Sequence, residues 1–186
     1  MRGYYSWWVW GIRACAAIFF GLLEIFYPAP TLFLAVLLYG AFNKIDGLLS
    51  IIIAAHWLRT TAAAPLFAAG AVGVLSGMLA LIWSTLEEQT MSLALGIAAI
   101  VRGSLEAIHA TRIRQQLADS RPALIAGLLI SAYGIVILLG PRIGLSALVM
   151  AFTVYTTAAG ACYFFTAIRI RNLERATPAR SQPEVS

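Results

Sequence analysis

Six long apolar segments limit the folds open to this chain more than any other feature. Each contains about 20 residues, the length an α-helix needs to cross the hydrocarbon core of a bilayer. They lie at about residues 8–27, 32–55, 66–84, 89–110, 123–140 and 144–168. Only 11% of the residues are charged, against roughly 25% in a soluble domain. The segments therefore predict an all-α membrane protein with six transmembrane helices.

The arginines predict how these helices are oriented. If the N-terminus is cytoplasmic, nine arginines fall in cytoplasmic segments and only Arg142 lies on the other side. Positive residues concentrate on the cytoplasmic side of membrane proteins. We therefore expect a multi-pass protein with both termini in the cytoplasm.

This topology also accounts for the net charge of +5, so no nucleic-acid partner is expected. The expected partner is the lipid bilayer, and a homo-oligomer or a complex with other membrane proteins stays open. Residues 1–172 are predicted to form the integral membrane domain. Residues 173–186 are polar and contain prolines, which predicts a disordered cytoplasmic tail.

Small residues recur at fixed intervals along the chain. Three sets of four positions share spacings of 7, 12 and 7 residues, and the sets are offset by 56 and 57 residues. They are Gly21, Pro28, Gly40 and Gly47; Gly77, Ser84, Gly96 and Gly103; and Gly134, Pro141, Thr153 and Gly160. The offsets predict three repeated two-helix hairpins, at about residues 7–59, 63–115 and 120–172. Because each hairpin crosses twice, all three share one orientation, which predicts a bundle with a pseudo-threefold axis along the membrane normal.

The repeated glycines predict where the hairpins touch. Gly40 and Gly47 lie on nearly one face of their helix, as do Gly96 and Gly103. Small residues let helices in a bilayer approach closely. Glycine is also common in membrane helices generally, but that does not explain the repeated spacing. We expect this face to be the contact between neighbouring hairpins.

Polar and charged residues interrupt the apolar segments. They are Arg13, Glu24, Asn43, Lys44, Asp46, Arg102, Glu106 and His109. A charge at the bilayer centre costs about 2.5–3.5 kcal/mol on insertion scales. The three basic and three acidic side chains of this set balance, so we expect a buried charge network inside the bundle.

The repeat brings two of these charges together. Asp46 precedes Gly47 and Arg102 precedes Gly103, so they occupy equivalent positions in two hairpins, with Ala159 as the third. If these positions face the pseudo-threefold axis, Asp46 and Arg102 form an ion pair near it and Ala159 leaves them room.

Three interpretations of the network stay open from the residues alone. The charged pairs could fix the register of the hairpins, as buried polar groups can do; exchanging Asp46 and Arg102 should then rescue folding. Alternatively, Glu24, Asp46, Glu106 and His109 could form a proton or ion pathway, because intramembrane ionisable residues often mark one. The third interpretation is a bound small ligand or lipid head group.

No arrangement of residues typical of catalysis is present. His56 and His109 are 53 residues apart with no cysteine near either, which does not fit a metal site. The sequence contains no G-x-S-x-G, Walker or dinucleotide-binding loop. We expect a protein that is not an enzyme and that uses neither cofactor nor metal.

In its three sets of small residues, its six spans and its length, the chain resembles the HdeD family of bacterial acid-resistance membrane proteins. The resemblance covers about residues 7–172. The chain departs from the family pattern at Ser84, where the turn proline is absent, and at Thr153. The resemblance implies a protein of the bacterial inner membrane that is linked to acid stress, and it implies no catalytic residues.

Three functions therefore stay open. The first is a non-enzymatic inner-membrane stress protein of the HdeD type. The second is a small proton- or ion-linked transporter or channel that uses the buried charges. The third is a membrane assembly or scaffold subunit.

Overall fold

Six α-helices make up nearly all of the described chain. The computed structural model describes residues 7–27, 31–56, 63–82, 88–114, 120–139 and 145–176. The helices are α1 (Trp7–Phe26), α2 (Leu32–His56), α3 (Ala63–Ile82), α4 (Glu88–Ile113), α5 (Arg121–Leu138) and α7 (Leu145–Ala176). No strand occurs within these ranges, and all six helices are long and apolar enough to cross a membrane. This confirms the predicted all-α membrane fold.

Local sequence explains several helix boundaries. Pro65 and Pro122 lie in the first turns of α3 and α5, where a missing N–H breaks no helical hydrogen bond. Helix α7 continues to Ala176, into the segment predicted to be a disordered tail. No glycine or proline interrupts it before Pro178. The rest of that tail, residues 177–186, lies outside the described ranges.

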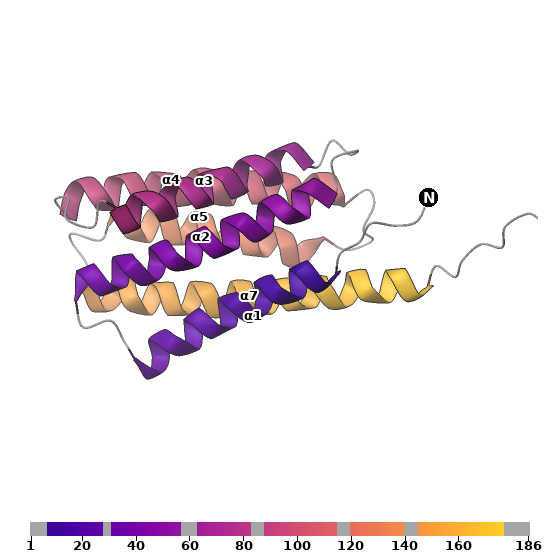
Figure 1. Ribbon diagram of the computed structural model, residues 1–186, viewed down its shortest axis with the longest axis horizontal. Helices are drawn as coiled ribbons and strands as arrows, with labels where there is room; N and C mark the ends of the chain where they lie inside the picture. Colours follow the sequence, from indigo (N-terminus) through magenta and orange to yellow (C-terminus); the bar gives the residue numbers. More distant parts are fainter. Residues whose placement is uncertain are drawn as a thin grey trace, which may run out of the picture.

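The helices form a closed ring. Neighbours in the ring follow the chain order, and α7 packs against α1 to close it. The most extensive contacts join α2 to α3, α4 to α5 and α7 to α1, whereas contacts within each hairpin are smaller. Figure 1 shows the helices running along one direction, with the start of α1 and the end of α7 at the same end. The predicted pseudo-threefold bundle of three hairpins is therefore confirmed.

Glycines allow the close contacts between hairpins. A Cβ atom on Gly47 of α2 would lie 2.7 Å from the carbonyl oxygen of Gly70 in α3. One on Gly103 of α4 would lie 2.5 Å from the carbonyl oxygen of Gly127 in α5. Atoms cannot approach so closely without displacement, so at these positions only glycine fits the observed helix separation. We call the three contacts between hairpins the glycine seams.

Other positions of the repeat also lie in the glycine seams. The remaining contacts are Gly40 with Gly77, Gly96 with Gly134, Gly21 with Thr157, and Gly160 with Ile18. The prediction that the repeated glycines lie between hairpins is thus confirmed. Pro28, Ser84 and Pro141 lie outside the described residues.

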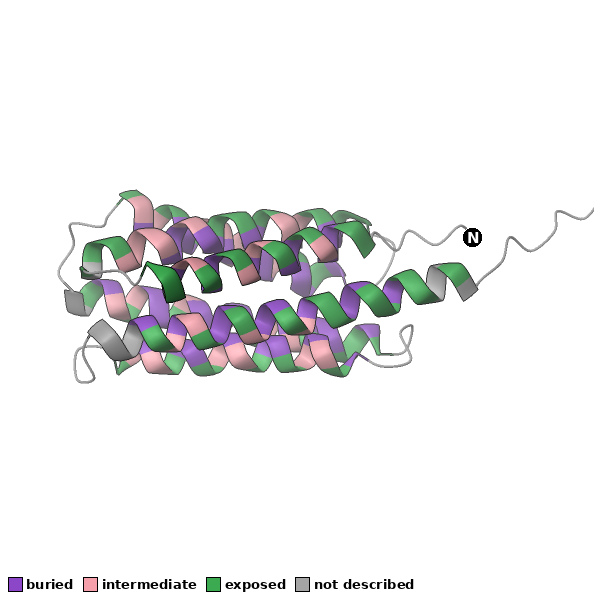
Figure 2. Cartoon of the chain, turned by 90° about the horizontal axis from the view of Figure 1, so that it is seen from below, coloured by how far each residue is buried: buried purple, intermediate pink, exposed green. Residues whose placement is uncertain are grey.

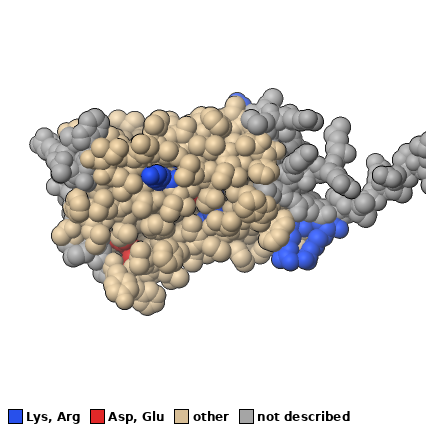
Figure 3. Space-filling model, in the orientation of Figure 1, with Lys and Arg blue, Asp and Glu red and all other residues tan. Residues whose placement is uncertain are grey.

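Each helix buries one side and exposes the other. Figure 2 shows buried residues recurring along every helix, with exposed residues between them. The exposed side remains apolar: Leu75, Ile82 and Met150 are 66%, 70% and 68% exposed. Figure 3 accordingly shows a face with few charged atoms. Such a surface suits contact with lipid rather than with water.

Candidate functional site

Four charged side chains meet inside the bundle. Arg13 of α1, Asp46 of α2, and Arg102 and Glu106 of α4 are each at most 4% exposed. Arg13 donates to Asp46 from Nε at 2.5 Å and from Nη2 at 3.0 Å, and its Nη2 also donates to Glu106. Arg102 Nη2 donates to Asp46 and lies 3.5 Å from a carboxylate oxygen of Glu106. We call these four residues the ion cluster.

Two neutral side chains extend the ion cluster. The Tyr163 hydroxyl on α7 accepts a hydrogen bond from Arg13 at 2.8 Å and donates one to Glu106 at 3.1 Å. The Tyr163 ring centroid also lies 4.0 Å from the guanidinium carbon of Arg13. Asn43 accepts from Arg102 at 2.5 Å and donates to the carbonyl of Tyr39 at 2.9 Å. Residues from all three hairpins are thereby joined.

The ion cluster is electrically balanced. Asp46 and Glu106 each form ion pairs with both arginines. Removing one partner from a buried ion pair costs about 3–5 kcal/mol, because an uncompensated charge remains. The relative positions of α1, α2 and α4 are therefore fixed by the need to keep all four groups together.

The repeat explains most of this arrangement. The expected ion pair between Asp46 and Arg102 is present, and the equivalent Ala159 is fully buried. The sequence analysis missed Tyr163. Tyr163 follows Glu106 by the same 57 residues that separate the second and third hairpins. Applying that offset to every polar position would have identified it.

Lys44 does not belong to the buried charge network, so that part of the prediction was wrong. Its side chain is exposed, whereas Asn43 and Asp46 on the same helix are buried. Successive residues of an α-helix are rotated by about 100°, so Lys44 and Asp46 point to opposite sides of α2. Balancing the charges of a segment, without regard to the helical face, gave the wrong assignment.

His109 and Glu24 are buried at different levels of the bundle. His109 is 1% exposed and shares the buried face of α4 with Arg102 and Glu106, as the helical spacing predicts. Glu24 is 2% exposed and lies on α1 about 16 Å along the helix from Arg13. Within the described ranges, no three His, Cys, Asp or Glu side chains form a group that could hold a metal ion.

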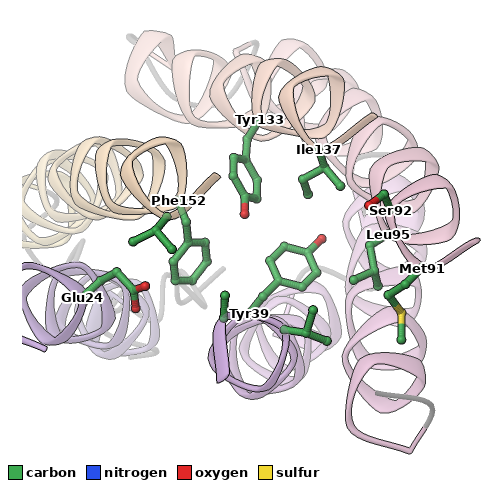
Figure 4. Close-up of a pocket in the computed structure, with 11 residues that line it drawn as sticks. Glu24, Tyr39, Met91, Ser92, Leu95, Tyr133, Ile137 and Phe152 are labelled. Atoms are coloured by element: carbon green, nitrogen blue, oxygen red, sulfur yellow. The ribbon is translucent and has the colours of Figure 1, made fainter. Parts of the chain in front are cut away.

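Glu24 lines a cavity near one end of the bundle. The cavity lies between α1, α2, α4, α5 and α7, is partly open, and offers about 60 Å³ to the centres of water molecules. Tyr39, Tyr133 and Phe152 project into the same space from α2, α5 and α7 (Figure 4). Their ring centroids are 5.9 Å (Tyr39–Tyr133), 6.0 Å (Tyr39–Phe152) and 5.8 Å (Tyr133–Phe152) apart. We call this the Glu24 cavity.

Aromatic side chains lie between the Glu24 cavity and the ion cluster. Along α2, Phe42 comes between the cavity residue Val36 and Asp46. Phe42 packs edge-on against Tyr155, with ring centroids 6.0 Å apart, and Tyr155 stacks on Tyr133 at 5.0 Å. We call Phe42, Tyr133, Phe152 and Tyr155 the aromatic layer. It separates the two buried sites.

Comparison with known families places the chain. A family described as a short repeat of unknown function (DUF308) matches residues 12–82 and 68–138, together more than half of the chain. The chain belongs to the DUF308 family. The second DUF308 match begins 56 residues after the first, the same interval as the sets of small residues. The first match includes the α2–α3 glycine seam and the second includes the α4–α5 seam.

No curated protein and no solved structure matches this DUF308 chain.

Proposed function

We propose that this DUF308 protein is a non-enzymatic, multi-pass protein of the bacterial plasma membrane that supports survival at low pH. The acid-stress role rests on the resemblance to the HdeD family. The non-enzymatic character rests on the ion cluster, which is the observation that carries the proposal. Its charged groups bind one another inside the bundle, so they act as a lock between hairpins.

The proposed orientation has both termini in the cytoplasm. Six of the described arginines lie near the end of the bundle where α1 begins and α7 ends, and positive charge favours the cytoplasmic side. They are Arg112, Arg114, Arg121, Arg169, Arg171 and Arg175. The guanidinium carbon of Arg171 lies 5.1 Å from the ring centroid of Trp7, and tryptophan is enriched at membrane interfaces. Arg142, assigned to the opposite side, lies outside the described residues.

Survival of an acid challenge tests the proposal. Cells that lack the protein are compared with cells that carry wild type, Asp46→Asn or Lys44→Gln, with the membrane level of each protein measured. We expect wild type and Lys44→Gln to protect equally, and Asp46→Asn to protect less, in proportion to its lower membrane level. If wild type gives no protection, the acid-stress role is wrong.

A proton- or ion-linked transporter is the second candidate. It is favoured by buried ionisable groups at several levels, from Glu24 through the ion cluster to His109. The aromatic layer, however, lies across such a route. Protein in liposomes with an internal pH-sensitive dye would decide. Flux that is lost in a folded Asp46→Asn variant would support transport, and flux equal to that of empty liposomes would contradict it.

A further inference from the structure

We propose that the Glu24 cavity binds a small organic ammonium ion. This site is distinct from the ion cluster and does not depend on the acid-survival role. Its recognition chemistry combines a buried carboxylate, three aromatic rings and a wall that is mostly apolar. Each of these features selects for a different property of the ligand.

The carboxylate selects for positive charge. Glu24 lines the cavity and is 2% exposed, so its interaction with a charged ligand is weakly screened by solvent. No arginine, lysine or histidine occurs among the described residues that line the cavity. A cation entering it therefore meets the field of the carboxylate without a competing positive charge beside it.

The rings select for an organic cation. Tyr39, Tyr133 and Phe152 surround one space, with centroids about 6 Å apart in each pair. Aromatic rings attract ammonium groups, and the attraction is stronger in desolvated sites. A divalent metal ion would instead need several oxygen ligands, and Glu24 is the sole carboxylate among the described lining residues.

The remaining wall limits size and shape. Met91, Leu95, Ile137 and Val149 provide apolar contacts for short alkyl groups, and Ser92 supplies one further hydroxyl. The space is large enough for several water molecules, each of which needs about 10–15 Å³ by this measure. A compact ammonium ion with one to four carbon atoms fits these limits. The aromatic layer behind the cavity makes it a binding site with one entrance.

Ligand-detected NMR on the full-length protein in lipid nanodiscs tests this directly. The probe is isopropylammonium chloride, and isopropanol serves as a neutral ligand of nearly the same shape. Sodium chloride keeps the ionic strength constant. We expect saturation transfer to the methyl groups of isopropylammonium, with a saturable concentration dependence, and little or none to isopropanol.

Two substitutions in the cavity locate the site. Glu24→Gln removes the charge with little change in shape and should weaken binding by about tenfold or more, as expected for loss of an interaction with a charged group. Ser92→Leu fills the cavity from α4 without altering Glu24 and should abolish binding. Lys44→Gln, exposed on the outer side of α2, is the matched control and should bind as wild type does.

The results separate the alternatives. If isopropanol binds as well as isopropylammonium, or if folded Glu24→Gln keeps wild-type affinity, the cavity does not select for cations and the proposal is wrong. If Glu24→Gln does not fold, Ser92→Leu decides: retained binding contradicts the proposal and lost binding supports it. Acid survival of cells is not part of this readout, so the outcome is independent of the proposed function.

Discussion

Asp46 accepts hydrogen bonds from Arg13 and Arg102 together, and the ion cluster depends on it most directly. One carboxylate of α2 thereby holds arginines from α1 and α4. The glutamate partner has a different support, since Glu106 also accepts from the Tyr163 hydroxyl. The consequences of a substitution at this scale follow from how many charges it leaves without a partner.

Asp46→Asn should destabilise the folded protein strongly, because two buried arginines then share one carboxylate. We expect a loss of about 3–5 kcal/mol, measured as unfolding by denaturing detergent in mixed micelles. Lys44→Gln, two residues away on the exposed side of α2, should leave the stability near that of wild type. Equal stability of the two variants would contradict the role assigned to the cluster.

Exchanging the charges of Asp46 and Arg102 should not rescue folding. In the exchanged protein an arginine at position 46 would face Arg13, and an aspartate at position 102 would lie one turn from Glu106. Like charges at such separations repel. We expect the double variant Asp46→Arg, Arg102→Asp to accumulate in membranes no better than Asp46→Arg alone. Rescue to the wild-type level would mean that Asp46 and Arg102 act as an isolated pair.

This expectation shows what the sequence could predict at the residue scale. The repeat placed Asp46 and Arg102 together, since equivalent positions of a threefold ring face one another. It could not show that Arg13, from a helix without an equivalent charge, would bind the same carboxylate. Nor could it reveal the Glu24 cavity, which depends on how rings from three helices pack.

At the scale of helices, the glycine seams set the spacing of the bundle. The backbones of α4 and α5 approach so closely at Gly103 that a Cβ atom there would lie 2.5 Å from the Gly127 carbonyl oxygen. Sequence periodicity was sufficient to predict these contacts, because a seam needs small residues at fixed intervals. The ends of the helices were less predictable: α7 runs on to Ala176, since nothing in the sequence stops it before Pro178.

Gly103→Leu should therefore separate α4 from α5. Forcing a larger side chain into a packed contact costs about 1–3 kcal/mol and sometimes more. Gly11→Leu is the matched control, because nothing lies within 4 Å of a Cβ atom at Gly11 and both substitutions raise helix propensity alike. Thermal unfolding in detergent should show a lower midpoint for Gly103→Leu and no decrease for Gly11→Leu. A similar decrease in both would argue against the seam.

At the scale of the whole molecule, the ring closes because α7 packs on α1 as α2 packs on α3 and α4 on α5. The start of α1 and the end of α7 lie at the same end of the bundle (Figure 1). The chain therefore has three similar connections between hairpins, of which one is left open by the position of the termini.

A circularly permuted chain that begins at α3 and ends at α2 should fold, with a flexible linker joining α7 to α1. Every helix keeps its orientation and its neighbours in this arrangement. A chain cut between α1 and α2 serves as the comparison, because its new termini fall at the opposite end of the bundle. We expect only the first to reach wild-type levels in membranes, as quantified by immunoblot. Equal levels of both would show that orientation does not limit assembly.

The distribution of charges in the ion cluster also bears on how the chain is synthesised. Arg13 and Asp46 belong to the first hairpin and pair with each other, whereas Arg102 and Glu106 lie one turn apart on a single helix of the second. Each hairpin can thus leave the translocon with its buried charges already neutralised by its own partner. The four-membered cluster needs to form only later, when neutral hairpins meet within the bilayer. Nascent hairpins therefore need not wait for the rest of the chain before they enter lipid.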